Sequence, residues 1–93
     1  MNENPSYRAG RDIVVATVDA MKAELKELIA SSAGNLTVDM SGVEMIDSKG
    51  LGLLIAASNT LGASERKLRI VGAAPDIVEL FRVMRLDRHF EID

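Results

Sequence analysis

The 93-residue sequence contains no cysteine. The fold therefore has no disulfide, and a thiolate nucleophile, a Cys-ligated zinc ion and a Cys-ligated iron–sulfur cluster are all excluded. Hydrophobic residues make up 47% of the chain, a share typical of a globular domain that is stabilised by core packing. The absence of cysteine also agrees with a reducing compartment, so we expect a cytoplasmic location.

Aromatic residues and an excess charge of one sign are scarce as well. The three aromatic residues, Tyr7, Phe81 and Phe90, are too few and too scattered to form a platform for stacked nucleic acid bases. A net charge of -3 creates no overall field that would attract nucleic acid or anionic lipid. No apolar run is long enough for a membrane span, and the polar N-terminus does not read as a signal peptide. We therefore expect no nucleic acid partner and no membrane association.

Length and local composition predict one domain that begins near residue 11. Residues 1–10 combine Asn, Pro, Ser and Gly with little apolar content, so we expect a flexible lead-in or a short irregular edge before a domain at residues 11–93. The β-branched run at Ile13–Val15 favours a brief strand. Thr17 then offers an N-cap oxygen to a helix over residues 18–32, whose apolar residues recur at helical spacing.

The rest of the chain alternates strand and helix patterns. Residues 36–40 alternate apolar and polar side chains, which predicts a strand, and a turn at Ser41-Gly42 follows. We then expect an apolar helix that ends at Gly62, a strand over residues 67–71, a helix that starts at Pro75 and a short strand over residues 90–92. This order implies an α/β fold with a small, mostly parallel β-sheet and about three α-helices.

The most unusual local composition lies at residues 47–52, where a hydroxyl is followed by two glycines at the start of the predicted apolar helix. In the simpler interpretation, Ser48 is an N-cap and the glycines permit a tight entry into the helix. In the functional interpretation, the first-turn amides of Lys49, Gly50 and Leu51 form an anion site beside a hydroxyl that can be esterified. The glycines would then allow the backbone of a partner to approach closely.

Known catalytic motifs do not fit this segment. Ile46 replaces the first glycine of a nucleophile elbow, and Lys49 precedes Gly50 instead of following it as in a phosphate-binding loop. A dinucleotide motif from Gly50 needs a small residue where Ile55 stands. Sequence separation alone leaves open a catalytic triad of Ser48, His89 and an aspartate, although a lone histidine in a charged stretch is usually solvated.

Two other groups of charged residues have plain explanations. Arg82, Arg85 and Arg88 recur near the end of the last predicted helix, where cations compensate the helix dipole better than they indicate a nucleic acid patch. Asp39 and Asp47 follow or end predicted strands and could approach a divalent ion. Two carboxylates without a third ligand are a weak indication of a metal site, so no metal site is predicted.

Residues 35–52, NLTVDMSGVEMIDSKGLG, resemble the central signature of the STAS domain, the family of sulfate transporters and anti-sigma-factor antagonists. The shared pattern is a strand, then Asp-x-Ser-Gly-Val, then Ile-Asp-Ser-x-Gly-Leu-Gly at the start of a helix. The resemblance continues through residues 67–71, 75–81 and 86–90, and so covers most of the chain from Gly10 onward. It implies a single STAS-like domain with an abbreviated N-terminal strand region, because family members usually begin with a fuller β-hairpin.

The resemblance implies a non-catalytic binding module of the anti-sigma factor antagonist type, switched by reversible phosphorylation. Carried over by position, Ser48 would be the phosphoacceptor and Asp47 the acidic neighbour that helps to present it. The implied partners are an anti-sigma factor or related serine kinase with a histidine-kinase-like ATPase fold, and a metal-dependent serine phosphatase; no cofactor is implied. The residues expected to contact the partner are Asp47, Ser48, Lys49, Gly50, Leu51 and Gly52.

Two alternatives stay open at this stage. The chain could be a non-phosphorylated STAS subunit or scaffold of a larger signalling or transport complex, such as a stressosome-like assembly or a lipid-transport ATPase. It could also be a small hydrolase that uses Ser48 as its nucleophile. Lys49 stands where the family usually has a small hydroxylated or apolar residue, which changes the motif without removing the hydroxyl of Ser48.

Overall fold

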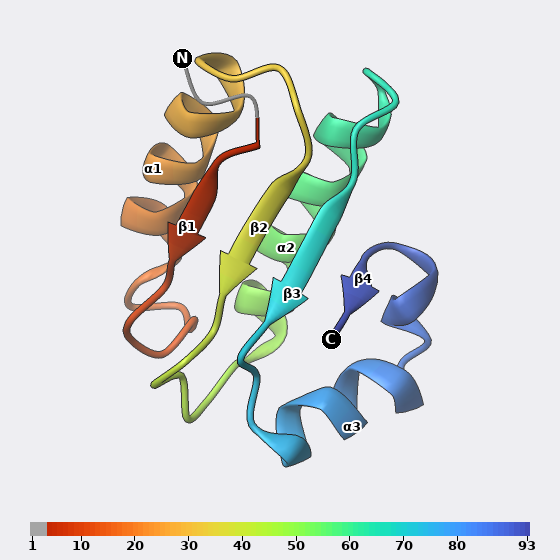
Figure 1. Cartoon of the computed structure of the whole chain (residues 1–93). Coiled ribbons are helices and arrows are strands. Elements are labelled where there is room, and N and C mark those ends of the chain that lie inside the picture. The colour runs from red at the N-terminus through yellow and green to blue at the C-terminus, as the bar shows by residue number, and fades with distance from the viewer. Residues whose placement is uncertain (1–3) are drawn as a thin grey trace.

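The computed structural model describes residues 4–93. Within this range, four strands alternate with three α-helices and one 3-10 turn (Figure 1). In chain order the elements are β1 (Ser6–Arg8), α1 (Val18–Ala30), β2 (Leu36–Asp39), α2 (Ser48–Gly62), β3 (Leu68–Val71), α3 (Pro75–Val83), the 3-10 turn η1 (Leu86–Arg88) and β4 (Glu91–Ile92).

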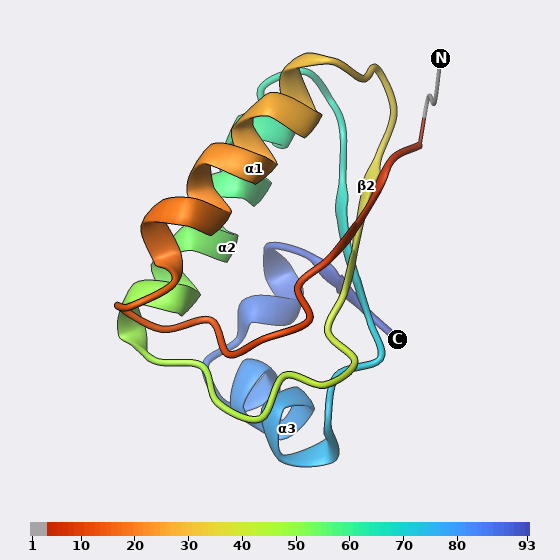
Figure 2. The same cartoon turned by 90° about the vertical axis from the view of Figure 1, so that its left-hand side faces the viewer.

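The four strands form one parallel sheet in the order β1-β2-β3-β4. Because this spatial order follows the chain order, right-handed crossovers place successive helices on the same face of the sheet. Figure 2 shows α1 and α2 side by side on one face and no helix on the other, while α3 lies beyond the carboxyl ends of the strands. The predicted α/β fold with a parallel sheet and three helices is confirmed.

The core lies between the sheet and the two helices that cover it. Alternation in β2 and β3 buries Leu36 and Val38 against Leu68 and Ile70 in matching register. The helices contribute Met21 and Leu25 from α1, Leu54 and Leu61 from α2, and Phe81 from α3. On the uncovered face, most side chains of β2 and β3 are polar or charged, as at Thr37, Asp39 and Arg69, and this explains how that face can remain in water.

The C-terminal segment closes the core beside β3. Phe81 of α3 and Phe90 pack edge to face, with ring centroids 5.4 Å apart. The buried hydroxyl of Ser58, in the second half of α2, donates to the backbone carbonyl of His89. The hydrogen bond of Ser58 attaches the segment after α3 to the C-terminal half of α2. Within residues 4–93, no helix combines the length and the apolar composition required to cross a membrane.

The N-terminal prediction needs correction. The first strand is β1 at Ser6–Arg8, inside the segment expected to be a lead-in, and not Ile13–Val15. Ile13 makes only an isolated bridge, and the chain then turns because the Thr17 hydroxyl accepts from the Val14 amide and donates to the Asp12 carbonyl. Thr17 therefore precedes α1 without capping it through its side chain.

The ends of two helices also differ from the prediction. α1 ends at Ala30, two residues before the expected end, because the Ser32 hydroxyl donates to the Leu28 carbonyl and competes with the helical ladder. α3 ends at Val83, and Arg85 adopts a left-handed conformation with φ of 58°. Arg82 is therefore the one member of the arginine series in the last turn of α3, where it can compensate the dipole.

Candidate functional site

Two connecting loops lie side by side beneath the first turn of α2. The loop after β1 and the loop after β2 meet through a parallel bridge between Ile13 and Ile46, beyond the carboxyl ends of the strands (Figure 2). The Ile13 amide donates to the Met45 carbonyl at 3.1 Å, and the Asp47 amide donates to the Ile13 carbonyl at 3.3 Å. In open parallel sheets this edge is where ligands and partners usually bind.

Asp47 joins the two loops to the start of α2. Its Oδ1 accepts from the Gly50 amide at 2.9 Å, its Oδ2 accepts from the Val15 amide at 2.9 Å, and its carbonyl accepts from the Leu51 amide. The Gly50 amide, followed by the Val15 amide, holds the pKa of the Asp47 carboxyl below its ordinary value. Asp47, and not Ser48, is therefore the N-cap of α2.

Ser48 is the first residue of α2, and its side chain is exposed. Two of the three amides of the expected anion site are already paired, because the Gly50 amide donates to the Asp47 carboxylate and the Leu51 amide donates to the Asp47 carbonyl. The interpretation of an open anion site made by all three amides is therefore wrong, because the carboxylate and the carbonyl of Asp47 already accept from the Gly50 and Leu51 amides. The Ser48 hydroxyl is exposed, and it follows directly after the Asp47 carboxylate, which two backbone amides hold in place.

Asp12 was not singled out by the sequence analysis, yet it supports the same platform. Its Oδ1 accepts from the amides of Glu44 and Met45, at 2.9 and 3.0 Å. Asp12 thus ties the loop after β1 to the loop after β2, and Asp47 makes the reciprocal tie through Val15. No periodicity or motif marks such a residue, because its partners are backbone amides more than 30 residues away.

The two glycines of the motif have opposite environments. A Cβ on Gly50 would lie 2.0 Å from the Ile13 carbonyl oxygen, whereas a Cβ on Gly52 would have no neighbour within 4 Å. The close backbone approach at Gly50 is therefore made by the chain itself. Gly50 and Leu51 are buried, whereas Lys49 and Gly52 are exposed and Asp47 is half-buried. The accessible part of the predicted contact set is therefore Asp47, Ser48, Lys49 and Gly52.

Two large apolar side chains on the same two loops are exposed to water. Val15 is 68% exposed and Met45 is 60% exposed. Both belong to the loops that Asp12 and Asp47 fix in place, since the amide of Val15 donates to Asp47 and that of Met45 to Asp12. The sequence could not distinguish these residues from core residues of the same type. We call the exposed residues Val15, Met45, Ser48, Lys49 and Gly52, together with half-buried Asp47, the Ser48 face.

The remaining candidates do not join the Ser48 face. His89 lies beside Ser58, ten residues beyond Ser48, which corresponds to about 15 Å along the helix. The triad is therefore incompatible with the fold. The Asp39 carboxylate accepts from the Ser41 amide in the loop that follows β2. The hydroxyl and the amide of Ser41 lower the pKa of the Asp39 carboxyl. Within residues 4–93 no group of three or more histidines and carboxylates could hold a metal ion.

Comparison with known proteins gives consistent matches. The family model described as "Mlab, STAS domain" matches residues 9–92. The anti-sigma-F factor antagonist RsfB of Mycobacterium tuberculosis is 30% identical over 83 residues, which cover 89% of this chain and 67% of the relative. The anti-sigma-B factor antagonist of Staphylococcus aureus is 27% identical over 79 residues, covering 85% and 73% respectively.

Solved structures support the same fold. A Thermotoga maritima protein assigned provisionally as an anti-sigma factor antagonist superposes with a TM-score of 0.81 at 18% identity, over 89% of this chain and 72% of that one. The anti-sigma factor antagonist SpoIIAA in its unphosphorylated form gives a TM-score of 0.72 at 14% identity, over 95% and 91%. With a family model that covers residues 9–92, the chain belongs to the STAS domain family.

Proposed function

We propose that this protein is a binding module of the anti-sigma factor antagonist type, and that phosphorylation of Ser48 switches its affinity for a partner. The observation that carries the proposal is the geometry of Ser48: an exposed hydroxyl at the first position of α2, held between two fixed loops. The names of the curated relatives support the choice of partner class. The partner is an anti-sigma factor or a related serine kinase with a histidine-kinase-like ATPase fold.

The Ser48 face has the composition of a docking surface. Val15 and Met45 offer exposed apolar area on the two loops tied to the start of α2, and Gly52 leaves room for a close backbone approach one turn further along α2. The hydrogen bonds of Asp12 and Asp47 fix the loops before binding, so little conformational freedom is lost when the partner docks. A partner can cover the bare hydroxyl of Ser48 at a much lower desolvation cost than a charged group, provided that the hydroxyl is hydrogen-bonded.

A phosphoryl group on Ser48 would add negative charge, and the Gly50 and Leu51 amides would not be available to bind it. It adds about -1.5 to -2 charges at neutral pH. Because the Gly50 and Leu51 amides already donate to Asp47, the phosphate lies beside a carboxylate and outside the hydrogen-bonding set of the first turn. A partner that covers the face must then desolvate two adjacent negative groups. Like-charge juxtaposition at an interface costs several kcal/mol, which corresponds to a hundredfold or greater loss of affinity.

The experiment is a phosphosite map of the protein isolated from its own cells. We expect intact-mass analysis to reveal a singly phosphorylated species, and peptide mapping to place the phosphoryl group on Ser48. Ser48→Ala should abolish this species, whereas Ser64→Ala, at an exposed serine just after α2, should retain it. A phosphoryl group on another residue, or its persistence in Ser48→Ala, would contradict the proposal. Partner capture without any phosphorylated species would instead support a constitutive scaffold.

A chemical test separates this function from hydrolysis. A nucleophilic serine needs a base within hydrogen-bond reach. His89 lies beside Ser58 in the C-terminal half of α2, whereas Ser48 is at the start of that helix. We therefore expect no labelling of the purified protein by a serine-directed fluorophosphonate probe under conditions that label a serine hydrolase control. Stoichiometric labelling of Ser48 would overturn the binding-module assignment. A cytoplasmic location follows from the proposal, because the kinase partner consumes ATP.

A further inference from the structure

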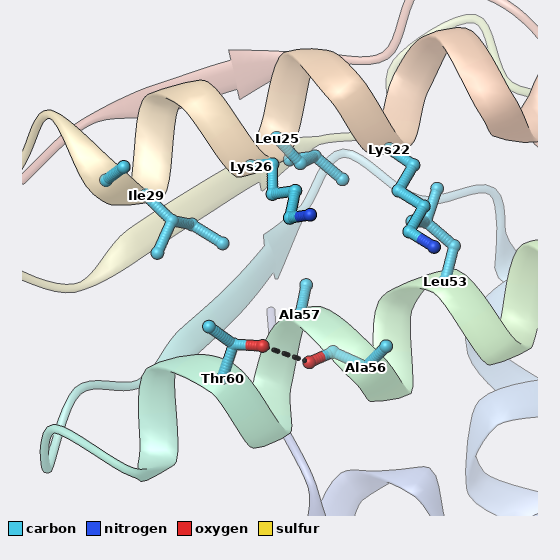
Figure 3. Close-up of a pocket in the computed structure, with 9 residues that line it drawn as sticks. Lys22, Leu25, Lys26, Ile29, Leu53, Ala56, Ala57 and Thr60 are labelled. Carbon is cyan, nitrogen blue, oxygen red and sulfur yellow. Dashed lines mark hydrogen bonds between the residues drawn. The ribbon is translucent and has the colours of Figure 1, made fainter.

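A second surface lies away from the Ser48 face, between α1 and α2. A groove of about 310 Å³ runs along the outer side of the two helices (Figure 3). Its apolar floor comes from Leu25 and Ile29 on one side and from Leu53 and Ala57 on the other. The exposed side chains of Ala30, Ala56 and Thr60 form low edges, so the groove is an open trough.

The α2 wall of this groove carries no charge. Leu53, Ala56, Ala57 and Thr60 follow the i, i+3, i+4, i+7 spacing of one helical face. From Gly50 to Gly62 α2 has no charged residue at all, a composition usual for a helix that is covered on every side. Here the sheet and α1 cover its inner sides. On the side that faces the groove, Leu53 and Ala57 are buried at the floor, while Ala56 and Thr60 are exposed.

The α1 wall adds positive charge. Lys22 and Lys26 are one turn apart, and Figure 3 shows both side chains reaching over the groove toward α2. No acidic residue lines the groove. The ion pairs found among residues 4–93 join Arg11 to Glu24 and Arg69 to Asp93, so neither lysine is neutralised in this way. A protein with net charge of -3 therefore presents a locally positive, apolar trough.

The dimensions favour a helix as the occupant. Lys22 to Ala30 spans about 12 Å and Leu53 to Thr60 about 10.5 Å along the helix axes, enough for two turns of a docked helix with apolar anchors at i, i+3 or i+4, and i+7. Acidic residues at i and i+4 along one edge of that helix would match the spacing of the two lysines. A lone acyl chain in an open trough would keep one side of its apolar surface in water.

We propose that the groove between α1 and α2 docks an acidic amphipathic helix of a partner protein. This contact is independent of Ser48, whose proposed phosphorylation would take place at the first turn of α2. The module could therefore bind one partner through the Ser48 face and hold a second acidic segment through the groove. In that arrangement the groove sets which complex the module joins, and the Ser48 face responds to the signal.

The test uses a displayed library of 16-residue amphipathic helical peptides with fixed apolar anchors and randomised flanking residues, selected against the whole protein. We expect the selected peptides to be acidic and to perturb amide resonances of α1 and α2 along the groove. Charge reversal in Lys22→Glu/Lys26→Glu should weaken the best peptide at least tenfold, as should Ala56→Glu. The control Lys67→Glu, at an exposed lysine before β3, should bind like the parent.

Folding of each variant is checked by circular dichroism and thermal melting, and the lysine pair remains informative if Ala56→Glu fails to fold. Ser48→Asp should bind the peptide normally, and this separates the groove from the proposed switch. Selection of basic or neutral peptides would overturn the proposal, as would resonance changes outside the groove. It would also be overturned if laurate, and no peptide, filled the groove, or if the protein dimerised through it in sedimentation experiments.

Discussion

The two helices that cover the sheet differ at both their starts and their outer faces. α1 begins at Val18 after Thr17, which provides no side-chain cap, and five of its 13 residues are charged. α2 begins at Ser48 after Asp47, whose carboxylate accepts from the Gly50 amide, and Lys49 is the single charged residue among its 15. The outer side of α1 is therefore charged and faces water, while Met21 and Leu25 face the core. α2 is anchored at its first turn and offers an uncharged surface beyond it.

This difference between α1 and α2 shows that α2 has two surfaces where a partner could bind without a change in the fold. The first turn of α2 is over-determined by hydrogen bonds from two loops, so the Ser48 hydroxyl can be modified while its backbone stays in place. The outer side of α2 is bounded by the lysines of α1. One helix thus supplies both proposed surfaces, and α1 contributes charge to the second.

The largest expected stability effect comes from the inner side of α2. Leu54 is 1% exposed, and Leu54→Ala should lower the free energy of unfolding by about 2–5 kcal/mol, because a buried cavity is left behind. Leu28→Ala on α1, at a half-buried position, should cost clearly less. Urea titration of both variants measures the contrast. A Leu54→Ala loss below about 1 kcal/mol would mean that α2 does not face the sheet as described.

The two glycines provide a sharper comparison within one turn of α2. Gly50→Ala forces a methyl group to within 2.0 Å of the Ile13 carbonyl oxygen, and we expect a loss of at least about 2 kcal/mol with disturbance of the loop after β1. Gly52→Ala meets open space and should stabilise the helix by about 0.5–1 kcal/mol. Thermal melts should therefore shift in opposite directions. Equal shifts would contradict the close approach of Ile13.

The acid limb of the stability curve tests the Asp47 cap. Its pKa is lowered in the folded protein, so its contribution is fully present above the unfolded value near 3.8 and is lost as the pH falls through the folded value. Asp47→Asn keeps a capping oxygen but has no such titration. We expect urea midpoints of the parent and Asp47→Asn to converge below pH 3.8, with the parent more stable at neutral pH. A constant difference from neutral to acid pH would contradict the cap.

The fold was largely predictable because its signals are local. Alternation in β2, the apolar α2 and Pro75 at the start of α3 each mark an element by short-range pattern. β1 escaped prediction because three residues with no apolar alternation form a strand only by pairing with β2. The position of Ser48 at the start of α2 was predicted. Occupation of its neighbouring amides by Asp47 was not, since carboxylate and serine compete for the same donors.

The most direct test of the switch is calorimetric titration with the serine kinase that labels Ser48. We expect the bare protein and Ser48→Ala to bind it tightly, and the phosphorylated protein and Ser48→Asp to bind at least a hundredfold more weakly, a difference of about 2.7 kcal/mol. Ser48→Asp should nevertheless melt within a few degrees of the parent, because negative charge is tolerated at a helix N-terminus. Equal affinity of the bare and phosphorylated protein, with both folded, would contradict the Ser48 switch.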